Sequence, residues 1–259
     1  MTGRLAGHHA LVTGGGTGIG AAIAAALAAD GAAVTVAGRR RAPLDDVCRT
    51  LARAQPVVAD VTREADCASM VQSATATFGP IDIVVANAGA AQSAPASRTA
   101  LALWQHMLDV NLTGAFLTVR AALPGVTRRD APPDRVRRVV FVASMAGLQG
   151  FAYVSAYCAA KHGVIGLMRA LAIELSRSGA TVNAVCPGYT ETPMLEASLD
   201  AIVAVTGRDR EAAREALAAS NPGGRLVTPE EVAAAVRRLC HPEAAGITGQ
   251  AIPVAEDAG

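Results

Sequence analysis

Short apolar segments of strand length alternate along the chain with longer Ala- and Leu-rich segments of helical length. The strand-like segments are residues 10–12, 34–37, 57–59, 81–86, 139–143, 182–185 and 251–254. The helix-like segments include residues 20–29, 65–78, 101–123 and 156–176. Strands that are apolar throughout are typical of a parallel sheet covered on both faces, and the alternation predicts repeated βαβ units. We therefore expect an α/β fold, and we find no linker that would divide residues 1–259 into two domains.

Two segments interrupt this alternation. Residues 127–138 contain two consecutive prolines and many charges, which predicts a solvated loop more readily than an anion site. Residues 190–224 contain a short amphipathic helix near 209–219, followed by the helix-breaking sequence at 221–224. Such an insertion after a strand predicts a lid over a binding site. The next helix is expected to begin at Thr228, because Pro229 and Glu231 complete a capping box.

Composition and charge narrow the function classes. The chain is 51% hydrophobic and 17% charged, as expected of a globular protein, and its formal net charge is +1. A net charge this small gives no global attraction to nucleic acid or to an anionic membrane, so neither is expected as a partner. The five cysteines are odd in number and show no CxxC spacing, which predicts neither a zinc site nor a disulfide framework. Without a signal-like or membrane-spanning segment, we expect a soluble cytoplasmic protein.

A glycine-rich turn follows the first predicted strand. Gly14, Gly18 and Gly20 fit the spacing GxxxGxG, and no register fits GxGxxG. Glycines alone can simply make a tight turn, but a strand, a glycine turn and a helix in succession let backbone N–H groups approach a pyrophosphate. This context favours a dinucleotide site.

The residue after the second predicted strand indicates which dinucleotide binds. An acidic side chain there would accept hydrogen bonds from the ribose hydroxyls of NAD, but the chain has Arg39, followed by two further arginines. Guanidinium groups suit the 2′-phosphate of NADP, so NADP(H) is favoured and NAD(H) stays possible. The alternative is that these arginines only line a solvated helix start.

A tyrosine and a lysine share one face of a predicted helix. Tyr157 is followed four residues later by Lys161, and an ammonium group beside a phenol would bring the phenol pKa towards the neutral range. Ser144 follows an apolar strand, where its hydroxyl can face a ligand at the carboxyl edge of a parallel sheet. Taken singly, these residues can equally be an ordinary helix face and a turn serine.

Together these motifs resemble the short-chain dehydrogenase/reductase family over nearly the whole chain. The matching pieces are TGGGTGIG at 13–20, Asp60 and Val61, ANAG at 86–89, Asn111, Ser144, YCAAK at 157–161 and PGYTETP at 187–193. The resemblance implies a single Rossmann-like domain with a doubly wound parallel sheet and helices on both faces, assembled as a homotetramer or homodimer. It also implies a catalytic tetrad of Asn111, Ser144, Tyr157 and Lys161, with Tyr157 as proton donor in reduction and base in oxidation.

The same resemblance implies the remaining site residues. Ser144 would bond the substrate carbonyl, Lys161 would hold the nicotinamide ribose, and Asn111 would anchor a water in a proton relay. The cofactor-binding residues would be Gly14, Thr17, Gly18, Ile19, Gly20, Asp60, Val61, Asn87, Ala88 and Gly89, together with Tyr157 and Lys161, with Pro187, Gly188 and Thr192 at the nicotinamide end. No metal would be required. The substrate would contact Gln149, Tyr153, Tyr189 and Met194, with Phe151 and Leu195 nearby.

The C-terminal third is similar to bacterial ketoreductases that act on 3-oxoacyl or polyketide-type substrates. We therefore expect NADPH-dependent reduction of a ketone to a secondary alcohol. One alternative is an NAD-dependent dehydrogenase of a secondary alcohol or 3-hydroxyacyl-CoA. A second is an NADP-sensing regulatory protein with the fold but not the reaction, although such a sensor would not need an acid-base pair.

Overall fold

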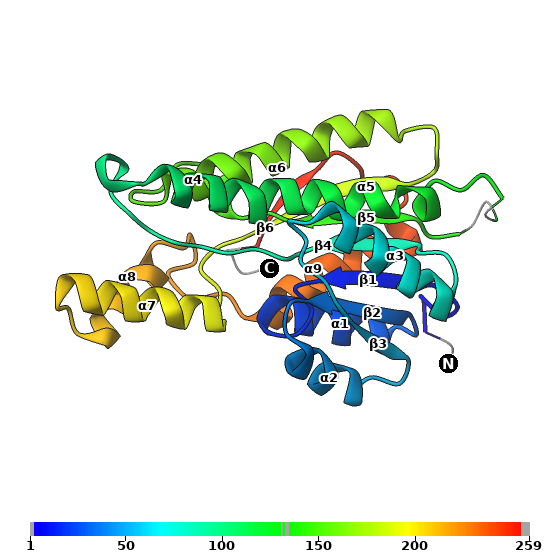
Figure 1. Cartoon of the computed structure of the whole chain (residues 1–259), viewed down its shortest axis with the longest axis horizontal. Coiled ribbons are helices and arrows are strands. Elements are labelled where there is room, and N and C mark those ends of the chain that lie inside the picture. Colours follow the sequence, from blue (N-terminus) through cyan, green and yellow to red (C-terminus); the bar gives the residue numbers. More distant parts are fainter. Residues whose placement is uncertain (1–2, 131, 133–134, 255–259) are drawn as a thin grey trace.

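The computed structural model describes residues 3–130, 132 and 135–254. Within these residues a seven-stranded parallel sheet has the order β3-β2-β1-β4-β5-β6-β7 (Figure 1). The strands are β1 (His9–Thr13), β2 (Ala33–Gly38), β3 (Ala54–Val58), β4 (Ile83–Ala86), β5 (Arg138–Val142), β6 (Thr181–Pro187) and β7 (Ala251–Val254). The strand order reverses between β1 and β4, so the sheet is doubly wound and the expected Rossmann-like α/β fold is confirmed.

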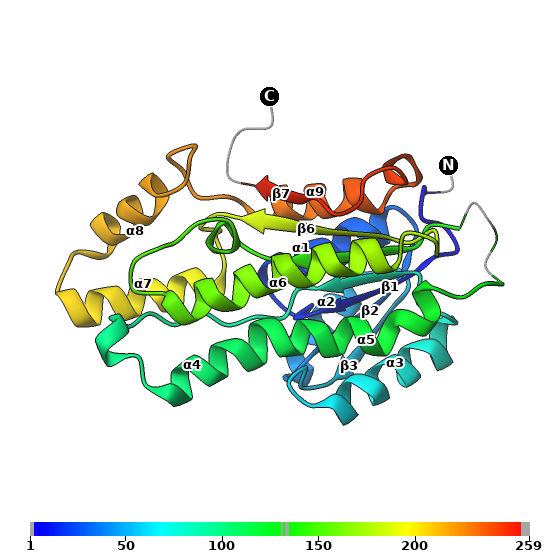
Figure 2. The same cartoon turned by 90° about the horizontal axis from the view of Figure 1, so that it is seen from above.

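Helices cover both faces of this sheet (Figure 2). They are α1 (Gly18–Ala29), α2 (Arg41–Arg49), α3 (Glu64–Phe78), α4 (Leu101–Leu108), α5 (Gly114–Val126), α6 (Ser155–Glu174), α7 (Pro193–Thr206), α8 (Arg210–Ala219) and α9 (Pro229–Cys240). One core lies between the sheet and α3, α5 and α6, and a second lies between the sheet and α1 and α9. Neighbouring strand residues alternate between these cores, because successive side chains of a strand point to opposite faces. Across the described part of the chain, no helix is both long and apolar enough to cross a membrane.

Two predicted element boundaries are wrong. The third strand occupies Ala54–Val58 rather than residues 57–59. It includes Pro56, which a strand tolerates because β3 lies at the edge of the sheet. The helix expected over 101–123 is divided by a π-helical turn at Asp109–Thr113. This turn contains Asn111, whose side chain bonds to the backbone of Ala90 and Met107.

The insertion after β6 forms two helices rather than one. α8 lies where the amphipathic pattern predicted a helix, and Asp209 caps it, but α7 precedes it and was not predicted. The signals for α7 are present in the sequence, because Thr192 caps the helix and Pro193 stands at its first position. The α7–α8 hairpin extends beyond the carboxyl edge of the sheet in both views (Figures 1 and 2). The capping box at Thr228 and Glu231 is confirmed.

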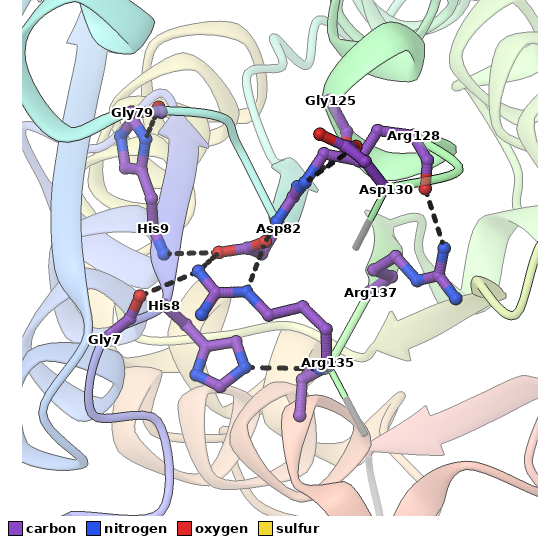
Figure 3. Close-up of polar contacts among 11 residues, drawn as sticks. Gly7, His8, His9, Gly79, Asp82, Gly125, Arg128, Asp130, Arg135 and Arg137 are labelled. Carbon is purple, nitrogen blue, oxygen red and sulfur yellow. Dashed lines mark hydrogen bonds and ion pairs between the residues drawn. The ribbon is translucent and has the colours of Figure 1, made fainter. Parts of the chain in front are cut away.

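The amino edge of the sheet contains a buried carboxylate that binds the loop before β5 (Figure 3). Asp82 is fully buried and accepts hydrogen bonds from Arg128, Arg135 and the backbone N–H of His9, at 2.9, 2.9 and 3.0 Å. Burial acts to raise the pKa of Asp82, but these bonds outweigh it and hold the pKa below its usual value. The expectation that the arginines of 127–138 are solvated is therefore wrong for Arg128 and Arg135. It is also wrong for Arg138, which is the first residue of β5 and is only 3% exposed. Residues 131, 133 and 134 of that loop lie outside the described residues.

Candidate active site

The turn after β1 is shaped for close backbone approach. Gly14 and Gly18 have left-handed backbone angles, with φ of 65° and 52°. A Cβ at Gly20 would stand 2.2 Å from the carbonyl oxygen of Gly14, so only glycine fits there. Thr17 makes no side-chain hydrogen bond to the first N–H groups of α1. The uncapped helix N-terminus can bind a phosphate, because its N–H groups and the helix dipole both favour an anion.

A cavity of about 390 Å³ lies beside this turn. Of the predicted cofactor residues, it is lined by Gly14, Thr17, Arg39, Asp60, Val61, Ala88 and Gly89. The other predicted cofactor residues are not among its lining residues: Gly18, Ile19, Gly20, Asn87, Tyr157, Lys161, Pro187, Gly188 and Thr192. Arg40, the second arginine of the predicted cluster, also lines the cavity. Further walls that the sequence did not indicate are formed by Pro43 and Leu44 and by residues at the end of α4 and in the π-helical turn.

Charges on two sides of this cavity lie close enough to interact. Asp60 accepts hydrogen bonds from the backbone N–H and the hydroxyl of Thr62, at 3.0 and 2.8 Å. The backbone bond is the main reason that the pKa of Asp60 is lowered, and Arg39 contributes to the same effect. Arg41 does not line the cavity and binds Asp45, one turn further along α2, through Nε. Arg39 and Arg40 are thus the arginines that face the cavity.

Asn87 joins the ends of β1 and β4. Its side-chain amide donates to the carbonyl oxygens of Thr13 and Gly14, at 2.8 and 3.3 Å. The Thr13 hydroxyl in turn accepts the backbone N–H groups of Asn87 and Ala88. These bonds fix the phosphate turn against the segment that follows β4, so Asn87 supports the cavity without lining it.

The residues of the predicted tetrad come from three separate segments. Ser144 follows β5 and is half-buried, with Oγ 3.1 Å from the N–H of Ala146. Tyr157 and Lys161 lie on successive turns of α6, and the Lys161 Nζ is 5.6 Å from the centroid of the Tyr157 ring. The same Nζ donates a hydrogen bond of 2.9 Å to the carbonyl of Val142, at the end of β5. This bond anchors α6 to the strand that precedes Ser144.

Asn111 and Lys161 converge on Gly89. A Cβ at Gly89 would stand 2.9 Å from the Asn111 Oδ1 and 3.8 Å from the Lys161 Nζ. Asn111 is buried, and its amide accepts the Ala90 N–H and donates to the Ala90 carbonyl. The side-chain amide therefore holds the π-helical turn next to the loop after β4.

Burial changes the pKa values of both titratable members of the tetrad. It raises the pKa of Tyr157 to about 12, and a hydrogen bond with Ser144 acts in the opposite direction. It lowers the pKa of Lys161 to about 8. The Tyr-x-x-x-Lys spacing predicted a lowered phenol pKa, so that prediction is wrong for this structure. The reason is that loss of water around the phenolate outweighs the ammonium group, which is directed at the Val142 carbonyl.

The predicted substrate residues lie on two loops beside the tetrad. Gln149 and Tyr153 are exposed on the segment between Ser144 and Tyr157. Tyr189 and Met194 follow β6, where Tyr189 is half-buried and Met194 is exposed. A missed contact connects the two loops, since the rings of Phe151 and Tyr189 meet edge to face at 6.3 Å.

The segment expected at the nicotinamide end reaches the phosphate turn. Pro187 ends β6, and Gly188 donates its N–H to the carbonyl of Val254 on β7. Thr192 caps α7, and its Cγ2 lies 3.1 Å from where a Cβ of Gly18 would stand. The base of the α7–α8 hairpin is therefore in contact with the start of α1.

Comparison with known proteins agrees with this geometry. Residues 8–203 match the family model described as short chain dehydrogenase. The chain belongs to this family. It is similar to the D-beta-hydroxybutyrate dehydrogenase of Cupriavidus necator, with 37% identity over 237 residues and 89% coverage of each chain. It is 40% identical over 250 residues to the cis-4-hydroxycyclohexanecarboxylate dehydrogenase of Sinomonas cyclohexanicum, covering 95% of this chain and 94% of that protein.

A solved structure shares the fold over almost its whole length. It is a variant of actinorhodin polyketide ketoreductase with NADPH, at a TM-score of 0.90 and 35% identity, covering 98% of this chain and 97% of that one. The family resemblance seen in the sequence is confirmed. The chain is an NAD(P)-dependent short-chain dehydrogenase/reductase, an oxidoreductase that acts on CH–OH and C=O groups.

Proposed function

We propose that this short-chain dehydrogenase/reductase uses NADPH to reduce a ketone to a secondary alcohol, with Tyr157 as the proton donor. The substrate class is a 3-oxoacyl thioester or a polyketide-like carbonyl compound. The observation that carries the proposal is the half-buried Tyr157 phenol, grouped with Ser144 and Lys161 at the carboxyl edge of the sheet. The name of the similar polyketide ketoreductase, solved with NADPH, supports this choice of substrate and cofactor.

The cavity beside the phosphate turn fits the adenosine half of NADPH. Its uncapped helix N-terminus suits the pyrophosphate, and the glycine cradle leaves no room for a Cβ at Gly20. Arg39, with Arg40 beside it, would bind the 2′-phosphate. Asp60 and Val61 would flank the adenine. The remaining contacts would come from Gly14, Thr17, Gly18, Ile19, Gly20, Asn87, Ala88 and Gly89, with Pro187, Gly188 and Thr192 at the nicotinamide end.

The tetrad supplies the proton and the charge stabilisation. NADPH supplies the hydride that reduces the carbonyl carbon. With a pKa of about 12, Tyr157 is protonated at neutral pH and can donate its proton to the carbonyl oxygen as negative charge develops there. The Ser144 hydroxyl would donate a hydrogen bond to the same oxygen. In the reverse direction the same two groups would bind the alcohol, with Tyr157 as the base.

Lys161 and Asn111 would restore the proton on Tyr157. With a pKa of about 8, Lys161 is mostly an ammonium ion at neutral pH and so can bind ribose hydroxyls and pass on a proton. Asn111 lies next to the same glycine, Gly89, and would anchor a water between Lys161 and solvent. In this arrangement Lys161 acts as an orienting and relaying cation rather than as the cause of a low phenol pKa.

The rim of the site would bind the body of the substrate. Gln149, Tyr153, Tyr189 and Met194 offer apolar surfaces with a few polar groups, which suits a medium-sized, largely apolar ketone. Residues 190–224 would act as a lid over it. We further propose that the chain is a single domain over residues 1–259, works in the cytoplasm and assembles as a homotetramer or homodimer.

The test is oxidation of NADPH by the purified enzyme against a panel of ketones, including 3-oxoacyl thioesters and cyclic ketones. We expect turnover with NADPH, and a loss of roughly 100- to 10,000-fold in kcat for Tyr157→Phe, the range associated with a general acid. Equal turnover with NADH would favour the NAD-linked dehydrogenase instead. Tight NADPH binding with no turnover on any carbonyl or alcohol would favour the regulatory protein, and a fully active Tyr157→Phe would refute the assigned proton donor.

A further inference from the structure

A buried asparagine lies at the base of the α7–α8 hairpin. Asn221 follows α8 and is only 4% exposed. Its Oδ1 accepts the backbone N–H of Tyr189 at 2.8 Å, and its Nδ2 donates to the Tyr189 carbonyl at 2.9 Å. The second Nδ2 hydrogen is used by the carbonyl of Arg225, at 2.7 Å. The amide is thus bonded through its oxygen and both of its N–H groups, as a buried polar group requires.

These bonds connect the two ends of the insertion. Tyr189 stands where the chain leaves β6, and Asn221 stands where it returns from α8, 32 residues later. Backbone hydrogen bonds that join the two ends are fewer than the three made by the Asn221 side chain. Val227 donates its N–H to the Tyr189 carbonyl at 2.9 Å, and Glu191 donates its N–H to the Val227 carbonyl. The Tyr189 N–H is bonded by the Asn221 side chain. Asn221 therefore holds the backbone position of Tyr189.

The side chain of Tyr189 reaches the reaction site. Its ring packs edge to face on Phe151, which belongs to the segment between Ser144 and Tyr157. The Tyr189 hydroxyl is close enough to contribute to the raised pKa of Tyr157. On its other side the ring packs on the small apolar cluster of the hairpin, which includes Leu195 and is separate from the two main cores.

We propose that Asn221 is a positioning residue for substrate binding, which fixes the Tyr189 ring as a wall beside Tyr157 by holding the Tyr189 backbone at the base of the hairpin. The inference rests on the proposed function, since it assigns Tyr189 to the substrate side of that site. Asn221 is in hydrogen-bonding contact with neither the tetrad nor the predicted cofactor residues. Its effect should therefore fall on the KM of the ketone and leave NADPH affinity unchanged.

The main variant is Asn221→Leu, which keeps the branched shape of the side chain and its number of heavy atoms but removes all three bonds. Because Tyr189 would then lose a fixed position, we expect the KM of the ketone to rise about tenfold, with kcat within about threefold and the NADPH Kd within about twofold of the unmodified enzyme. Asn221→Ala also removes all three bonds, and it brings neither a charge nor extra bulk into the buried site. It should raise KM in the same way, and it serves as the test if Asn221→Leu does not fold.

The matched control is Asp209→Ala. Asp209 caps α8 by accepting the N–H groups of Glu211 and Ala212, so its loss destabilises the same hairpin without touching Tyr189. Because the hairpin would still cover the substrate and Tyr189 would keep its bonds, we expect this control to raise KM clearly less than Asn221→Leu does. If Asp209→Ala raises KM as much as Asn221→Leu, or if Asn221→Leu leaves KM within twofold, the proposal is wrong.

A double variant tests the route through Tyr189. If Asn221 acts by positioning that ring, the double variant Tyr189→Ala/Asn221→Leu should have the same KM as Tyr189→Ala alone. A KM in the double variant that equals the product of the two separate fold-changes would overturn the proposal. Amide hydrogen exchange of residues 188–191 gives a readout without turnover. Faster exchange in Asn221→Leu than in Asp209→Ala supports the positioning role, whether or not a ketone is reduced. A failure to reduce any ketone would count against the proposed function and not against the positioning role. Equal exchange in the two variants overturns the positioning role.

Discussion

The choice between NADPH and NADH can be tested at Arg39. This residue follows β2, is exposed, and lines the cavity that would hold the adenosine. Its charge contributes to the lowered pKa of Asp60 across that cavity. Arg41 lies two residues further on and binds Asp45 instead. Changing Arg39 therefore removes a cation from the cavity, and changing Arg41 removes a cation that is already bound elsewhere.

The expected magnitude follows from the strength of a charged hydrogen bond. Such a bond contributes about 1.5–3 kcal/mol, or roughly 10- to 150-fold in affinity, and the exposed position of Arg39 favours the lower end. Arg39→Ala should thus weaken NADPH binding about tenfold. Arg39→Asp adds repulsion of about 1 kcal/mol per unit of phosphate charge at about 4 Å in water, so with the phosphate near −2 the total loss reaches about 100-fold or more.

The assay is equilibrium titration of each variant with NADPH and with NADH, at low and at high salt. NADH lacks the 2′-phosphate, so its Kd should stay within about threefold for every variant, and Arg41→Ala should bind both cofactors like the unmodified enzyme. High salt should reduce the Arg39→Asp effect, because exposed charges are screened. Equal losses for the two cofactors, or a loss for Arg41→Ala as large as for Arg39→Ala, would refute the assignment of Arg39 to the phosphate.

Three other predictions concern pH and stability. With a Lys161 pKa of about 8, kcat/KM for ketone reduction should fall as pH rises above about 8, since the ammonium ion is then lost; a pH–rate profile measures this. Asp82→Asn should lower the free energy of unfolding by about 3 kcal/mol or more in urea, because Arg128 and Arg135 lose their buried anionic partner. Because the folded state holds the pKa of Asp82 below its ordinary value of 3.8, the stabilisation that Asp82 gives the fold is complete at neutral pH. This stabilisation is lost as the pH falls below about 3.8 and through the lower pKa of the folded state. Thr228→Ala should cost about 1 kcal/mol in the same urea assay, because it removes a helix cap.

Each of these has an outcome that contradicts it. A reduction rate that stays flat up to pH 10 would show that Lys161 does not titrate near 8. An unchanged urea midpoint for Asp82→Asn would contradict the prediction, because it would show that the fold is equally stable without the carboxylate between the two arginines. For Thr228→Ala, an unchanged free energy of unfolding would show that the cap does not stabilise α9. Glu231→Gln is the partner control, since it removes the charge of the capping box but retains an acceptor for the Thr228 N–H.

The sequence alone determined the features that depend on local spacing. The glycine turn at 13–20, the Tyr157 and Lys161 pair one helical turn apart, and Arg39 after the second strand are each fixed by a few neighbouring residues. The alternation of apolar strands and longer helices determined the parallel sheet, because each βαβ unit has only one favoured hand. Local chemistry also placed the start of α9 at its capping box.

Only the tertiary structure decided the features that depend on groups far apart in the chain. The π-helical turn forms where Asn111 bonds to Ala90, 21 residues earlier, and no local pattern contains that contact. The direction of the Tyr157 pKa shift depends on how much water the folded protein removes from the phenol, which the spacing to Lys161 cannot reveal. The same holds for Asn221: it reads as a helix breaker in the sequence, and its bonds to Tyr189 exist only because folding brings the two ends of the insertion together.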